Sequence, residues 1–254
     1  MRLLTFLLTH IFLLPLFGSA NEEKAKPGRF VMFVGVDISG SFMNGGHFDN
    51  SLKFLATYLY THMQGMGDLD VPHSLFVGSI GGSKVDEAKT FYPIQAFQDK
   101  NADQIEAQLH QIFPRNKKNP FTDYNAFFKQ VATFVQNKKL VMRPISIVLI
   151  SDGIPDAPNL DGKYDFRNLN IKTLENLTRN ITVRLLYTNP VVAEKWQTKI
   201  PRQRVKVWAQ DATVMRLWNA GNIFDPKLPL NDQGKFFSWL KDNVDFNVRV
   251  KRVD

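Results

Sequence analysis

Cysteine is absent from all 254 residues of the chain. Its absence excludes a disulfide framework, a thiolate metal site and a cysteine nucleophile. It also fits a bacterial envelope protein better than a disulfide-rich extracellular protein of an animal. Histidine is scarce, with five in the chain, and none of them shows ligand spacing such as H-E-x-x-H. The sequence therefore gives no support to a zinc enzyme or a cysteine-dependent one.

Long apolar runs are lacking after the amino terminus. Residues 3–17 form an apolar run interrupted by His10 and Pro15, which follows Arg2 and precedes Gly-Ser-Ala at 18–20. This pattern predicts a secretory signal peptide over residues 1–20, followed by a polar tether over 21–28. An uncleaved anchor is the weaker alternative, because the run is shorter than the roughly 20 apolar residues of a spanning helix. We expect a soluble, exported protein of the periplasm or the extracellular space.

Charge and composition are those of an ordinary globular chain with a basic excess. Hydrophobic residues make up 44% and charged residues 22% of the chain, and the formal net charge is +8. Basic residues concentrate in 195–206 and 249–252. In an exported protein such patches favour peripheral contact with anionic envelope surfaces or acidic partners over nucleic acid. A solvated basic face that only aids solubility is an equally good explanation.

The chain is organised around residues 30–41. An apolar run over residues 30–36 ends in Asp37-Ile38-Ser39-Gly40-Ser41. A short apolar run closed by a Gly/Ser turn indicates a buried strand of a parallel sheet. Ligands bind at the carboxyl ends of such strands, so we expect the oxygens of Asp37, Ser39 and Ser41 to converge there. Oxygen ligands suit hard cations such as Mg²⁺, whereas a turn with capping hydroxyls is the alternative.

The D-x-S-x-S pattern after an apolar strand resembles the metal-ion-dependent adhesion site (MIDAS) of von Willebrand factor type A (VWA) domains, found also in integrin inserted domains. The pattern of that family continues with a threonine and then with an aspartate that closes a second buried strand. Thr122 stands ahead of an amphipathic segment, and Asp152 closes an apolar run that begins at Ile147. All three pieces are thus present in the order of the family.

The resemblance implies a set of metal ligands. Hydroxyl oxygens would bind Mg²⁺, or Mn²⁺ or Ca²⁺, directly, while two carboxylates would act largely through water molecules. The hydroxyls are those of Ser39, Ser41 and Thr122, and the carboxylates are those of Asp37 and Asp152. Asp123 could replace or assist Thr122, since the two residues are adjacent.

Strands that alternate with helices predict an α/β fold with a doubly wound, mostly parallel sheet flanked by helices, the Rossmann-like architecture of VWA domains. We expect the VWA domain over residues 29–218 and a C-terminal extension, packed on the domain or following it, over residues 219–254. The less regular segments are interpreted as a short edge strand at 90–94, a helix at 168–178 and a strand-like end at 246–253.

The resemblance implies a protein-binding module rather than an enzyme. An Asp or Glu carboxylate of the partner would complete the coordination of the metal, and nearby loops would supply specificity. Two alternatives stay open. One is a structural subunit of a bacterial envelope assembly, such as a secretion, pilus or conjugation machine. The other is a metal-assisted hydrolase, which would need a general base, and the best candidates are only Asp123 and Asp156.

Overall fold

The structure is a computed structural model that describes residues 28–84, 87–116, 120–155 and 165–254. The expected signal peptide, the tether up to residue 27 and Asp156 lie outside the described residues. Among the helices that are described, none is both long enough and apolar enough to cross a membrane.

The strands form one six-stranded sheet in the order β3-β2-β1-β4-β5-β6. Neighbouring strands are parallel except for β3, which pairs with β2 in the antiparallel sense. The strands are β1 (Val31–Asp37), β2 (Ser74–Ile80), β3 (Tyr92–Pro93), β4 (Ile145–Ile150), β5 (Ile181–Thr188) and β6 (Lys206–Asp211). This topology confirms the predicted α/β class with a mostly parallel sheet.

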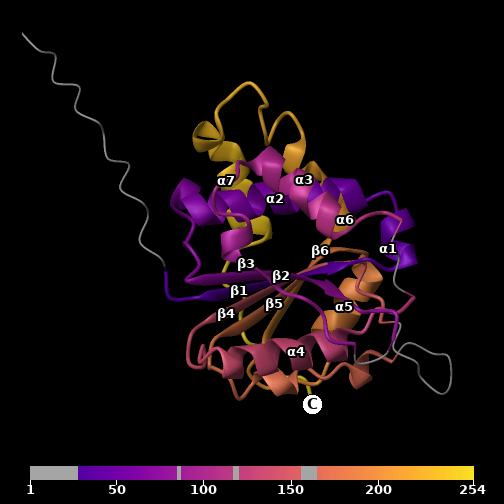
Figure 1. Cartoon of the computed structure of the whole chain (residues 1–254). Helices are drawn as coiled ribbons and strands as arrows, with labels where there is room; N and C mark the ends of the chain where they lie inside the picture. The colour runs from indigo at the N-terminus through magenta and orange to yellow at the C-terminus, as the bar shows by residue number, and fades with distance from the viewer. Residues whose placement is uncertain (1–27, 85–86, 117–119, 156–164) are drawn as a thin grey trace, which may run out of the picture.

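Helices cover both faces of the sheet, as Figure 1 shows. One face carries α1 (Gly40–Asn44), α2 (Phe48–Gln64), α3 (Ala102–Ile112), α6 (Ala212–Met215) and α7 (Gly234–Asn243). The other carries α4 (Tyr124–Asn137) and α5 (Pro190–Thr198). Within β1, Met32 and Val34 join the first core, whereas Val31 and Phe33 join the second. Successive strand residues point to opposite faces, so a strand buried on both sides is apolar throughout.

Short 3₁₀ helices complete the described elements: η1 (Met66–Asp68), η2 (Ile94–Ala96), η3 (Phe166–Asn168), η4 (Lys172–Leu174), η5 (Arg216–Asn219) and η6 (Leu230–Asp232). The helix predicted over 168–178 is wrong, because η3 and η4 lie there instead. The Asn125 side chain, on α4, donates to the carbonyl of Asn168 at 2.9 Å and accepts from the N–H of Asn170 at 2.7 Å. A side chain thus binds backbone groups that a helix would have paired internally.

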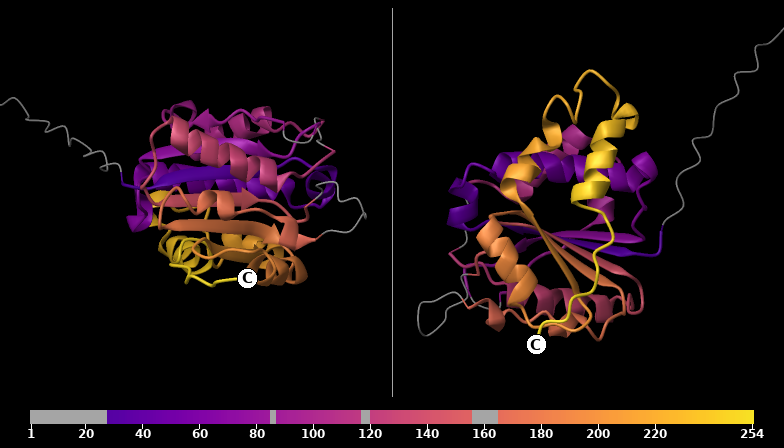
Figure 2. Two further views of the ribbon diagram at one scale, coloured as in Figure 1. Left: turned by 90° about the horizontal axis from the view of Figure 1, so that it is seen from below. Right: turned by 180° about the vertical axis from the view of Figure 1, so that it is seen from behind.

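The predicted strand at 246–253 is also wrong. Only Val253 pairs there, in an isolated antiparallel bridge with Arg202. In Figure 2 this end of the chain runs from the layer of α7 to the layer of α4 and α5. On the way it passes the edge strand β6, where the rings of Phe246 and Trp208 lie 4.7 Å apart. The segment therefore covers a sheet edge with side chains, without extending the sheet.

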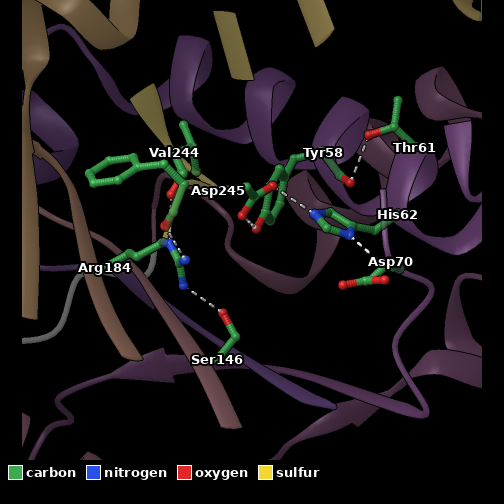
Figure 3. Close-up of polar contacts among 9 residues, drawn as sticks. Tyr58, Thr61, His62, Asp70, Ser146, Arg184, Val244 and Asp245 are labelled. Carbon is green, nitrogen blue, oxygen red and sulfur yellow. Dashed lines mark hydrogen bonds and ion pairs between the residues drawn. The ribbon is translucent and has the colours of Figure 1, made fainter. Parts of the chain in front are cut away.

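A polar network fastens the C-terminal segment to the sheet and to α2 (Figure 3). Arg184 of β5 donates to the carbonyls of Val244 at 2.6 Å and Phe246 at 3.2 Å. Between them, Asp245 accepts from the Tyr58 hydroxyl at 2.8 Å and lies 3.0 Å from Nε2 of His62. Residues far apart in the chain thus hold the segment after α7 in one position.

Candidate metal centre

The first part of the candidate centre is the turn that joins β1 to α1. Asp37 is fully buried at the end of β1. Its Oδ1 accepts the N–H of Ser39 at 2.8 Å, and its Oδ2 accepts the hydroxyl of Ser151 at 2.5 Å. Ser39 is the N-cap of α1, where its Oγ accepts the N–H of Phe42 at 3.4 Å. The D-x-S-x-S residues therefore form a tight turn in which the carboxylate is fixed on both sides.

The two serine hydroxyls of this turn lie side by side, with Ser39 Oγ 3.1 Å from Ser41 Oγ. Ser39 is buried and Ser41 is exposed, so the pair reaches from the interior to the surface. Magnesium takes oxygen ligands at about 2.1 Å in an octahedron, which sets neighbouring ligands about 3 Å apart. The separation of the two hydroxyls fits two adjacent positions of such an ion.

Asp152 lies at the same end of the sheet as Asp37, where the parallel strands have their carboxyl ends. It is two residues beyond Ile150, which pairs with Val36 of β1. Its Oδ1 accepts the N–H of Ile154 at 3.0 Å, and its backbone carbonyl accepts the hydroxyl of Thr188 at 2.7 Å. The pKa of Asp37 is raised to about 7, mainly by burial and secondly by the nearby charge of Asp152. A divalent cation between the two carboxyl groups would offset both effects.

Thr122 reaches this edge through the end of β2. Ile80, the last residue of β2, pairs with Asp37. The next residue, Gly81, has a φ of +75°, and a Cβ there would lie 1.8 Å from the carbonyl oxygen of Phe121. The N–H of Gly82 donates to that same oxygen at 3.2 Å. The loop of Thr122 thus lies beside the tip of β1, and Thr122 itself is buried.

Asp123, the alternative to Thr122 as a ligand, stabilises the start of α4. It is the N-cap of α4, and its Oδ1 accepts the N–H of Ala126 at 2.9 Å. This bond directs one oxygen of the carboxylate toward the helix terminus. The cap uses one oxygen of Asp123, and Thr122 stays the predicted ligand.

Two residues of the site, Ser151 and Tyr124, were not among the candidates predicted from the sequence. The hydroxyl of Tyr124 lies 2.6 Å from Ser151 Oγ. Because the proton of Ser151 goes to Asp37, Tyr124 donates to Ser151. Burial, followed by the charges of Asp37 and Asp152, raises the pKa of Tyr124 well above its ordinary value, so it remains a neutral donor. The available signal was a serine at the end of an apolar strand, next to Asp152.

Within the described residues, no group of three or more His, Cys, Asp or Glu side chains is arranged to hold a metal ion. The candidate centre instead combines hydroxyls with two carboxylates. The structure places Asp37, Ser39, Ser41, Thr122 and Asp152 at one edge of the sheet. Their identity as metal ligands stays a prediction.

No protein-family model matches the chain, and no curated protein matches it. Among solved structures it is similar to proximal thread matrix protein 1 of the mussel byssus, with 14% identity over 75% of this chain and 47% of that chain, at a TM-score of 0.46. The pilus adhesin SpaC of Lactobacillus rhamnosus GG is 12% identical over 87% of this chain and 31% of that one, also at 0.46.

The manganese-loaded TRAP protein of Plasmodium vivax is 13% identical, over 73% of this chain and 69% of that one, at a TM-score of 0.43. This chain therefore spans less than half of the length of the first two of these solved chains. Likenesses at this level of identity and superposition do not bear on what the chain binds.

Proposed function

We propose that this chain is an exported binding module of the VWA type, which holds a divalent cation and binds an acidic residue of a partner protein through it. The observation that carries this proposal is the pair of hydroxyls of Ser39 and Ser41, 3.1 Å apart beside the buried carboxylate of Asp37. Ser39, Ser41 and Thr122 would hold Mg²⁺, or Mn²⁺ or Ca²⁺, with Asp37 and Asp152 acting mainly through water.

The bound ion would supply an electrophilic position for a carboxylate of the partner. The residues around the ion would set how strongly it attracts that carboxylate. Neutral hydroxyls next to the ion leave much of its charge uncompensated, which favours one more anionic ligand. Asp37, held by the Ser39 amide and the Ser151 hydroxyl, cannot swing inward to take that position without breaking both bonds. The loops around Asn44 and Phe121 border the site and would select the partner.

A catalytic use of the site has less support. Of the two acids considered as general bases, Asp123 caps α4, and Asp156 lies outside the described residues. A permanent place in a secretion, pilus or conjugation assembly would use the same site and differ in how long the partner stays bound. We retain such an assembly as the alternative. It would be supported by a partner protein that copurifies with this chain at a fixed molar ratio.

The test is calorimetric titration of Mg²⁺ and Mn²⁺ into the metal-stripped protein and three variants. Asp37→Asn and Ser39→Ala are each expected to weaken binding at least about tenfold, since loss of a supporting group typically weakens a metal about 10- to 100-fold. Ser74→Ala, at the start of β2 on the opposite edge, is the matched control and should bind as the natural protein does. Unchanged affinity in both site variants would contradict the proposal. Capture of an acidic partner should then depend on the metal and on Ser39.

A further inference from the structure

Three arginines stand in one row at the amino-terminal edge of the sheet, opposite the candidate metal centre. The first residues of β1, β4 and β5 are register partners in neighbouring parallel strands. Arg29, Arg143 and Arg179 each precede one of these first residues by two positions. Neighbouring strands are about 4.8 Å apart, so the three strand starts that these arginines precede lie within about 10 Å of one another.

Acidic side chains lie near one end of this row, where Asp68 and Asp70 line the same pocket as Arg29. In the part of the chain that the structure describes, none of the three arginines has an acidic partner within 4.0 Å. Asp68, an acid at this edge of the molecule, is paired with Lys241 at 3.7 Å. The row is reinforced by exposed Lys138 and Lys139, which follow the end of α4. Unpaired like charges at this spacing attract an extended anionic surface.

Apolar side chains project from the same edge. Val141 and Met142 lie between Lys139 and Arg143 and are 39% and 77% exposed, and Met142 is the most exposed large apolar side chain of the described residues. The backbone of Met142 has a φ of 72°, a conformation uncommon outside glycine. Its N–H donates to the carbonyl of Leu177 at 2.9 Å. The segment of Val141 and Met142 is therefore held with its apolar side chains exposed, and basic residues flank it in the sequence.

We propose that this edge docks on an anionic phospholipid surface. Met142 and Val141 would enter the interfacial layer, while the arginine row meets lipid phosphates. A soluble polyanion would be served by the charges alone, whereas exposed apolar side chains surrounded by basic ones suit the boundary between headgroups and acyl chains. Because β1 spans seven residues, about 23 Å, the candidate metal centre would face away from the membrane and stay open to a partner.

The first test measures binding of the exported, naturally processed protein to phosphatidylcholine vesicles with and without about 30% phosphatidylglycerol. Each basic residue near such a surface contributes about fivefold in affinity, so R29Q/R143Q/R179Q is expected to bind the anionic vesicles about a hundredfold more weakly. The control K53Q/K227Q/K235Q removes the same charge elsewhere on the surface and should bind within about threefold of the natural protein. Thermal unfolding checks that the variants are folded. No binding to anionic vesicles, or an equal loss in the control, would overturn the proposal.

The second test does not depend on the arginine variants. Since the chain has no cysteine, Met142→Cys accepts a single environment-sensitive fluorophore. Its emission should shift to the blue with anionic vesicles and not with neutral ones. The same label at Leu228→Cys, 47% exposed in the C-terminal segment, should not shift. A labelled residue 142 that stays in water while the protein binds anionic vesicles would overturn the proposal in favour of a site for soluble polyanions.

Discussion

The hydroxyl of Ser151, the residue before Asp152, donates a 2.5 Å hydrogen bond to Oδ2 of Asp37. This bond joins the ends of β4 and β1, two neighbouring strands 114 residues apart in sequence. Together with the Ser39 amide it leaves the buried carboxylate one orientation. The geometry of the candidate centre therefore depends on a residue outside the D-x-S-x-S pattern.

Ser151→Ala should weaken both the fold and metal binding. The change leaves Asp37 Oδ2 and the Tyr124 hydroxyl without their partner, which costs about 1–3 kcal/mol of unfolding free energy. Under the proposed function, metal affinity should fall about 10- to 100-fold, because Asp37 loses its orientation. Urea unfolding in chelator and calorimetry measure the two effects. Tyr124→Phe keeps the bond between Ser151 and Asp37 and should lose clearly less metal affinity, and an equal loss would refute this account.

Gly81→Ala should displace the loop of Thr122. An alanine there would adopt a φ of +75° and place its Cβ 1.8 Å from the carbonyl oxygen of Phe121. We expect the free energy of unfolding to fall by at least about 1–3 kcal/mol, as for other strained backbone positions. Gly234→Ala is the control, because no atom lies within 4 Å of the added Cβ. Urea unfolding measures the free energy of unfolding of both variants. Equal values would contradict this prediction, because they would mean that the loop shifts at no cost.

Asp245 should make the fold sensitive to acid. Burial favours a higher pKa for this carboxyl, but His62, Arg184 and the Tyr58 hydroxyl together hold it below its ordinary value. Its stabilising contribution is therefore fully present above the pKa of the unfolded chain, about 3.9, and is lost as the pH falls through the folded pKa.

Asp245→Asn should cost about 2 kcal/mol at pH 7, and the difference from the natural protein should shrink as the pH falls below about 3.9 and through the folded pKa. Urea unfolding across this range measures it. The exposed Asp242, changed to Asn on the same segment, serves as the comparison and should alter stability little at any pH. A deficit of Asp245→Asn that persists in acid would mean that packing, not charge, is lost.

Phe236→Ala tests whether residues 219–254 are integral to the domain that we expected to end at 218. Phe236 is fully buried on α7, in the core that also contains Phe54 and Trp218. Removing a buried phenylalanine costs about 3–5 kcal/mol. Leu228→Ala, at a half-exposed position of the same segment, should change stability by less than about 0.5 kcal/mol. Equal melting temperatures of the two variants would show that the segment folds separately.

The alternation of strands and helices could be predicted because it follows from local periodicity. The continuous apolar run before Asp37 shows that this strand is buried on both sides. The helix predicted over 168–178 failed because a side chain from another element, Asn125, binds the backbone there. The strand predicted over 246–253 failed because the segment after α7 is held by Arg184 and packs against Trp208. Contacts of this kind leave no period in the sequence.

The sequence by itself determined the fold class and the candidate oxygen donors, because a buried strand and the turn that ends it are local patterns. Only the tertiary structure decided that Ser151 and Tyr124 fix Asp37 and that Gly81 brings Thr122 to the same edge. It also decided that Arg29, Arg143 and Arg179 form one row at the other edge. The reason is the register between parallel strands, which is set by helices packed across the whole domain and so cannot be read from any one segment.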